Sequence, residues 1–182
     1  MRADARRNHA RLLKVATEAF AEHGEGASLD DIAKRAGVGS GTLYRHFPTR
    51  RALLEAAYAA RIEALGERGE ELSRTLPPGE ALTAWLHELC VATIQVRGLK
   101  TLLGTAATDT PVTACGTVVK STATALLTAA QSEGTLRPDL TPTDLLRLTQ
   151  GVATAAELGG GEAGEIERHL GWLLNGIRVS GE

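Results

Sequence analysis

The residues best equipped for chemistry lie in one stretch near the amino terminus, between positions 28 and 50. Hydroxyl, imidazole and guanidinium groups are frequent there, and such groups donate hydrogen bonds to phosphate oxygens and to the edges of bases. The stretch therefore predicts contacts to nucleic acid. The candidate contact residues are Ser28, Ser40, Gly41, Thr42, Tyr44, Arg45, His46, Thr49 and Arg50.

Helical periodicity divides the second half of this stretch into two faces. Val38, Leu43 and Phe47 recur on one side, which predicts that this side anchors a short helix in a core. The donors then occupy the opposite side. There Gly41 would let the backbone approach a duplex closely, and Arg45 has the forked geometry that binds guanine.

The whole segment 28–47 has the layout of a helix-turn-helix, with two short helices joined by a tight turn. Ser28 and Asp31 have the spacing of a capping box at its start. The next helix begins at Thr49, where unpaired amide groups together with Arg50 suit a phosphate. A plain helical corner is the alternative interpretation, but the clustering of donors on one face favours DNA binding.

Charge is distributed unevenly along the chain. The 182 residues carry a formal net charge of −2. Residues 1–51 hold ten lysines and arginines against six acidic residues, whereas residues 52–182 hold ten against sixteen. A basic amino-terminal segment on an acidic remainder suggests that one end meets a polyanion, although a difference of this size also arises by chance.

Several classes of protein are excluded or disfavoured. The longest stretch without a charge, residues 121–132, is shorter than the roughly 20 residues of a membrane span. No apolar segment follows the basic start of the chain, so we expect no secretion signal and a cytoplasmic location. Cys90 and Cys115 cannot form a disulfide framework, and His87 and Glu88 do not converge with Cys90 as metal ligands.

No arrangement typical of an enzyme is found. Neither a Ser/His/Asp set, a Cys/His pair nor paired carboxylates fall on one predicted face, so we expect no catalysis, no metal and no cofactor. An all-helical enzyme is therefore a weak alternative.

The six prolines mark the boundaries of the elements. All of them lie between windows of helical periodicity, and no window shows the alternation of a strand, so the predicted fold class is all-α. The nine expected helices span approximately residues 4–23, 28–37, 40–47, 49–73, 80–96, 99–107, 110–133, 142–158 and 162–179.

Residues 37–54, with the sequence GVGSGTLYRHFPTRRALL, resemble the signature of the tetracycline-repressor (TetR) family of bacterial transcriptional regulators. Residues 28–33 also fit, and the resemblance covers about residues 8–65. Two positions depart from the pattern. Gly39 stands where the family usually has a capping serine, and Ser40 where many members have a longer polar or basic side chain, so one DNA contact would be shorter or missing.

The resemblance implies a nine-helix, omega-shaped homodimer. A helix-turn-helix DNA-binding domain would occupy residues 1–65, and a ligand-binding and dimerisation domain residues 66–182. Residues 96–99 and 134–139 resemble the SbtR-like branch of the family. The expected function is that of a repressor that a small-molecule effector releases from a pseudo-palindromic operator. A helical protein-interaction module that has lost DNA binding is the alternative.

The resemblance also implies that the last two helices pair with those of a second copy. Trp172 lies away from the apolar stripe of its helix, which predicts two buried faces, one of them against a partner. Burial of Trp172 within one subunit is the alternative. The expected interface residues are Leu145, Leu148, Thr149, Val152, Ala153, Ala156, Ile166, Leu170, Leu173 and Ile177.

The resemblance also implies an effector pocket between the fifth, sixth, seventh and eighth helices. Small residues are abundant over residues 101–128, and they would either leave a cavity or let the helices pack closely. Because no charged cluster is predicted there, we expect at most a small, largely uncharged effector. The expected lining is Trp85, Leu89, Thr93, Ile94, Leu102, Leu103, Val112, Cys115, Val119 and Gln150.

Overall fold

The computed structural model describes residues 2–95, 100 and 113–178, and in these ranges the chain is helical apart from turns and one isolated β-bridge, between Leu136 and Arg178. The all-α prediction is confirmed. The eight α-helices of these ranges and one 3₁₀ turn are α1 (Arg2–His23), η1 (Gly24–Gly26), α2 (Leu29–Arg35), α3 (Ser40–His46), α4 (Arg50–Thr75), α5 (Pro78–Gln95), α7 (Ala114–Ser132), α8 (Pro142–Leu158) and α9 (Ala163–Ile177).

The expected count of nine helices is not confirmed. Eight are observed, because the helix expected over residues 99–107 falls almost entirely outside the described residues. The helix expected to start at residue 110 begins instead at Ala114, where the Thr113 side chain accepts a hydrogen bond from the Gly116 amide at 3.0 Å. The fifth helix begins at Pro78, two residues early, since proline suits a first helical turn.

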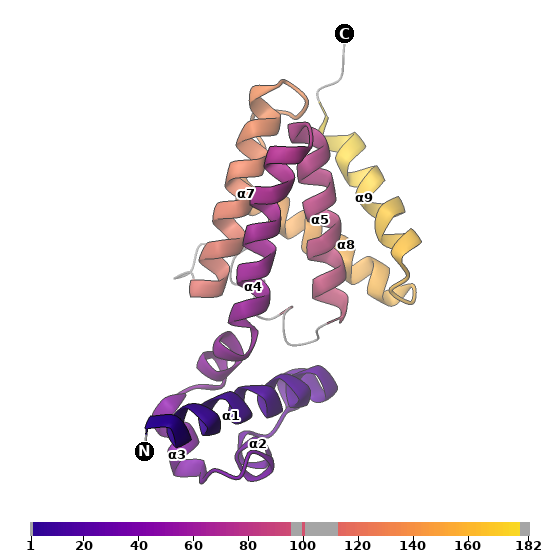
Figure 1. The fold of residues 1–182 in the computed structure, drawn as a ribbon. Helices are drawn as coiled ribbons and strands as arrows, with labels where there is room; N and C mark the ends of the chain where they lie inside the picture. The colour runs from indigo at the N-terminus through magenta and orange to yellow at the C-terminus, as the bar shows by residue number, and fades with distance from the viewer. Residues whose placement is uncertain (1, 96–99, 101–112, 179–182) are drawn as a thin grey trace.

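Two groups of helices are joined by α4 (Figure 1). The short helices α2 and α3 lie with α1 at one end of the molecule, and α4 leads from them into a bundle with α5 and α7. Helices α8 and α9 pack beside α5 in the same bundle. Helix α4 continues across the boundary expected at residue 65, so that division of the chain stays a prediction.

Side-chain caps mark the starts of several helices. The side chains of Ser28, Thr49 and Thr141 each accept a hydrogen bond from an amide three residues later, at 3.1–3.2 Å. Each bond satisfies an amide that the helix itself leaves unpaired. At the end of α2, Gly37 has a φ of 65°, a left-handed conformation that glycine adopts without steric cost.

A continuous apolar core runs through both groups of helices. Near α3 it contains Phe20, Ile32 and Leu43, all essentially inaccessible to solvent. In the bundle the fully buried Trp85 donates its indole N–H to the carbonyl of Leu65 at 2.9 Å, which satisfies its one polar group.

Helices α4 and α7 approach closely because α4 presents glycine to its neighbour. A Cβ atom at Gly66 would lie 2.8 Å from Val118 Cγ1, and one at Gly69 would overlap the methyl group of Thr122. Only a residue without a side chain permits this separation of the two helices.

Among the described helices, none combines the length and apolar character needed to cross a bilayer.

Candidate nucleic-acid interface

Helix α3 is anchored by the residues that the sequence predicted. Leu43 is fully buried, Phe47 is 6% exposed and Val38 is half-buried, so they hold the inner side of the helix against α1 and α2. Tyr44, at 45% exposed, belongs to the other side. That side also carries the expected contact residues Ser40, Gly41, Arg45 and His46, which are exposed, and Thr42, which is half-buried.

The turn before α3 is held by main-chain bonds. The amide of Val38 donates to the carbonyl of Ala33 at 3.0 Å, and Gly39 begins α3 with no side-chain cap. The departure seen in the sequence at Gly39 therefore has a structural counterpart, because the first amides of α3 receive no side-chain oxygen from that position. The helix depends instead on the burial of Leu43.

Arg45 folds back on its own helix. Its Nε donates to the carbonyl of Gly41 at 3.2 Å and its Nη2 to Thr42 Oγ1 at 3.1 Å. Both bonds are exposed to solvent, and exposed bonds of this kind contribute about 1 kcal/mol each or less. A base edge that accepts two bonds from the guanidinium would compensate for their loss.

The start of α4 is bound to the start of α2. Thr49 caps α4, and Arg50 Nη1 donates to the carbonyl of Ala27, the residue just before the Ser28 cap. Thr49 and Ser28 are exposed, whereas Arg50 is half-buried. One N–H group of the Arg50 guanidinium is thus engaged within the protein, which the sequence did not predict, and the remaining N–H groups are those available to a phosphate.

A cluster of rings joins α1 to the end of α3, and sequence reasoning missed one of its members. His9 of α1 stacks on Phe47 with 5.6 Å between ring centroids, and it meets the ring of His46 edge to face with 6.2 Å between centroids. His9 carried no signal in the sequence, because its neighbours are nearly 40 residues away and only the tertiary fold brings them together. It adds a second imidazole beside the predicted contact residue His46.

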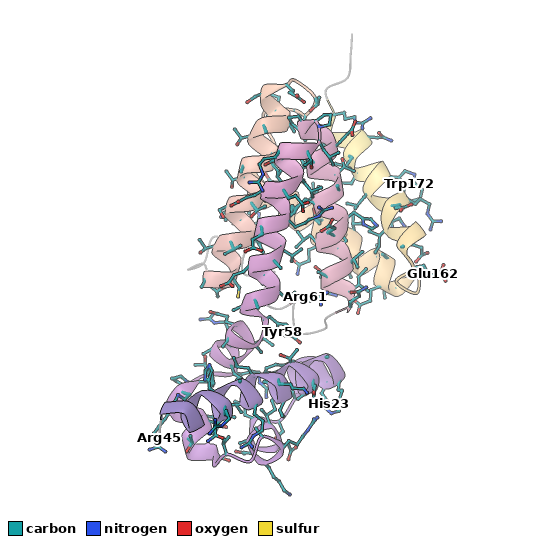
Figure 2. All side chains as sticks on the ribbon, viewed as in Figure 1. His23, Arg45, Tyr58, Arg61, Glu162 and Trp172 are labelled. Carbon is teal, nitrogen blue, oxygen red and sulfur yellow. The ribbon has the colours of Figure 1, made fainter. Side chains whose placement is uncertain are left out.

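Helices α1 and α4 are joined by polar bonds at a buried tyrosine. The hydroxyl of Tyr58 donates to the carbonyl of Thr17 at 3.4 Å, and Thr17 Oγ1 donates to the carbonyl of Ala57 at 3.3 Å. Burial raises the pKa of Tyr58, an effect that the nearby positive charge of Arg61 partly opposes. Figure 2 places Tyr58 where α4 leaves the three-helix group.

The expected effector pocket is almost closed. Leu89, Thr93, Val119 and Gln150 surround a cavity of about 10 Å³, together with two residues of α8, which is room for about one water molecule. Trp85 and Cys115 are buried in the core, and Ile94 is half-buried. The remaining expected lining residues, Leu102, Leu103 and Val112, lie outside the described residues.

The two cysteine thiols of the helical bundle are poorly suited to act as nucleophiles. Cys90 and Cys115 are both buried and are not joined to each other. Burial raises the pKa of Cys90 to about 12 and also raises that of Cys115. Neither thiol therefore forms the nucleophilic thiolate at neutral pH.

Most of the expected dimer residues face the core of the single subunit, and the interface itself stays a prediction. The apolar stripes of α8 and α9 pack against each other and against α5. Two other faces remain exposed, with Leu148 at 42% and Trp172 at 64%. Val152 and Leu173 are half-buried. The expected interface residues that are instead buried within the subunit are Leu145, Thr149, Ala153, Ala156, Ile166, Leu170 and Ile177.

A helix-turn-helix with an outward row of donors, followed by a helical body, defines a class of protein that reads DNA with its amino-terminal end. The family model described as bacterial regulatory proteins, tetR family, matches residues 12–57. The model described as transcriptional regulator SbtR-like, C-terminal domain, matches residues 77–179. The chain belongs to the TetR family of bacterial transcriptional regulators, and both predicted resemblances are confirmed.

Solved structures of similar length support the assignment. A TetR transcriptional regulator from Streptomyces coelicolor is 34% identical with a TM-score of 0.58, over 94% of this chain and 99% of that one. A TetR regulatory protein from Mycobacterium vanbaalenii is also 34% identical, with a TM-score of 0.53, over 98% and 99% of the two chains. FadR from Bacillus subtilis, solved in complex with stearoyl-CoA, shares the fold at 18% identity and a TM-score of 0.68, over 93% and 99% of the two chains.

Among curated proteins, an HTH-type transcriptional regulator from Staphylococcus aureus (strain USA300) is 50% identical over 48 residues. The match covers 26% of this chain and 26% of that protein, so the chain spans about a quarter of the length of the curated relatives it matches.

Proposed function

We propose that the protein is a homodimeric repressor that binds a pseudo-palindromic DNA operator through α3. The observation that carries the proposal is the outer face of α3, where Tyr44, Arg45 and His46 are exposed while Leu43 and Phe47 hold the helix in place. Arginine can bind a base edge, and tyrosine and histidine can donate to the flanking phosphates. Two such helices reach successive major grooves about 34 Å apart in a symmetric dimer.

The dimer would form through the exposed faces of α8 and α9. Leu148 and Trp172 are large apolar residues left exposed by the packing of the subunit, and Val152 and Leu173 lie beside them, partly covered. Figure 2 shows Trp172 on the outer side of α9. Exposed apolar surface of this kind favours association with a second copy.

Release by a small molecule is the third part of the proposal. FadR from Bacillus subtilis, which shares the fold, holds stearoyl-CoA in its solved structure, so the architecture accommodates an effector in that protein. In this chain α4 connects the bundle of α5, α7, α8 and α9 to the end that carries α3. A ligand that favours one orientation of α4 would change the separation of the two α3 helices.

Selection from a random-sequence duplex library tests the proposal. The purified protein is expected to enrich one sequence with two inverted half-sites about one helical turn apart. Light scattering on the selected complex should give two chains for each duplex. Failure to enrich any sequence would instead favour a helical protein-interaction module that does not bind DNA.

A further inference from the structure

A groove of about 530 Å³ runs between α4 and α5, separate from the small cavity in the body. Its volume lies in the range of small-molecule binding sites. Four of the residues that line it are apolar: Ala64 and Leu65 of α4, and Val91 and Ala92 of α5. The two alanines leave room that larger side chains would fill, so the groove offers an apolar surface to a ligand.

Two arginines of α4 lie along this groove, and their charges are compensated to different degrees. Arg68 donates to Glu88 across the groove at 2.9 Å and to Glu71 at 2.6 Å, and these carboxylates raise the pKa of Arg68. Arg61, two turns earlier, donates to the neutral amide oxygen of Gln95, at a long 3.4 Å. In the part of the chain that the structure describes, no carboxylate lies within ion-pair distance of Arg61.

One polar atom of the groove lacks a partner. His87 lines the groove beside Glu88, and its Nε2 is buried without a hydrogen bond from or to any described residue. A buried polar atom without a partner costs free energy, which a ligand group able to bond to it would recover.

We propose that this groove binds an amphipathic molecule with a single carboxylate. The carboxylate would replace Gln95 on Arg61, and the apolar part would lie over Ala64 and Val91. A second negative charge at the far end would meet Glu88, which already neutralises Arg68. The groove therefore favours a monoanion over a dianion, and over an uncharged molecule of the same shape.

The site deepens the proposed function, on which its regulatory role rests, because it would supply the class of effector. Arg61 lies three residues after Tyr58, whose hydroxyl binds α1. An occupant of the groove would thus contact α4 within one helical turn of the joint to the DNA-reading helices (Figure 2). This groove is a different site from the internal pocket, for which a largely uncharged effector was expected.

Calorimetric titration of the full chain without DNA tests binding. The probes are octanoate, octan-1-ol and suberate, which share one chain length and carry one, no and two carboxylates. Octanoate is expected to bind at least about tenfold more tightly than either of the others. The proposed site would be overturned if octan-1-ol bound as tightly as octanoate, or if octanoate gave no heat up to about 5 mM.

Two variants locate the binding. Arg61→Gln removes the exposed cation and is expected to weaken octanoate binding at least about tenfold. Ala64→Glu places a carboxylate in the groove at an exposed position and should have the same effect. The matched control is Arg74→Gln, which removes an exposed cation of α4 outside the groove and should leave binding unchanged. Unchanged binding in Arg61→Gln, or equal loss in Arg74→Gln, would overturn the assignment.

A second titration separates the site from the repressor proposal. Octanoate is expected to weaken binding of the wild-type protein to its selected duplex at least about fivefold, and to leave the Arg61→Gln variant unaffected. If no duplex is bound while octanoate still binds, the repressor proposal fails and the site stands. If the duplex is bound and octanoate does not bind, the site fails and the repressor proposal stands.

Discussion

Arg50 donates to the carbonyl of Ala27, 23 residues earlier, and so ties the first turn of α4 to the residue before the cap of α2. Two roles follow for this side chain. It orders the start of the helix-turn-helix, and its remaining N–H groups present a positive charge beside α3, the helix proposed to contact DNA.

Arg50→Ala is expected to weaken binding to all duplex sequences alike and to reduce the slope of log K against log salt by about one, because one phosphate contact is lost. Fluorescence anisotropy at several salt concentrations measures both quantities. Arg74→Ala, which removes a cation from the far end of α4, serves as the control. A loss of affinity with an unchanged slope would assign Arg50 to positioning alone.

Arg45→Ala is expected to relax sequence preference rather than to weaken binding uniformly. The side chain is exposed and its bonds within the protein are local, so the fold should not change. Loss of a paired contact to a base costs about 1–3 kcal/mol of discrimination at one position. Binding to a set of duplexes with single base-pair changes would reveal which position becomes tolerant, and an unchanged profile would place Arg45 away from the bases.

Gly69→Ala is expected to destabilise the protein by about 1–3 kcal/mol, because the new methyl group overlaps Thr122 and crowds Trp85. Adding Thr122→Ser removes the opposing methyl group and should restore part of the loss. Urea unfolding of the single and double variants gives the coupling between them. Gly164→Ala, in open space on α9, should be neutral or slightly stabilising, and an equal loss there would refute the packing argument.

Trp172→Glu is expected to convert the dimer into monomers, because it places a charge on the exposed apolar face of α9. Size-exclusion chromatography with light scattering measures the mass. Thr124→Glu, on the exposed side of α7, should keep the dimer. A Trp172→Glu protein that still forms dimers would place the interface elsewhere.

Stability should fall as pH rises above 9, in part because of Cys90. Its pKa is about 12 in the folded protein and near 9.0 in the unfolded chain, so between these values only the unfolded state loses the proton. The contribution of this group is fully present below pH 9 and declines by up to about 1.4 kcal/mol per pH unit above it. Urea unfolding from pH 8 to 10.5 should show a steeper decline for the wild type than for Cys90→Ala.

Features set by neighbouring residues were predicted from the sequence. The caps at Ser28 and Thr49 depend on bonds across three residues, and the two faces of α3 depend on helical period alone. Such local rules need no knowledge of the tertiary fold, which explains why the helix-turn-helix and its exposed donors were located in advance.

Features set by distant residues were not predicted. The bond from Arg50 to Ala27 and the stacking of His9 on Phe47 depend on how α1, α2 and α4 come together. Seven of the ten residues expected at the dimer interface are buried within the subunit for a related reason: α8 and α9 have apolar residues on two sides, and period alone does not tell which side Leu145 or Trp172 turns to the core.

At the joint between α1 and α4, the hydroxyl groups of Tyr58 and Thr17 donate to main-chain carbonyls of the other helix. Each of these bonds therefore depends on one side chain only. Helix α4 is 26 residues long, about 39 Å from end to end. A tilt of about 5° about one end of such a rod moves the other end by about 3 Å, roughly the rise of one base pair. In the proposed dimer, the length of α4 would therefore make the spacing of the two α3 helices sensitive to very small movements of the helical bundle.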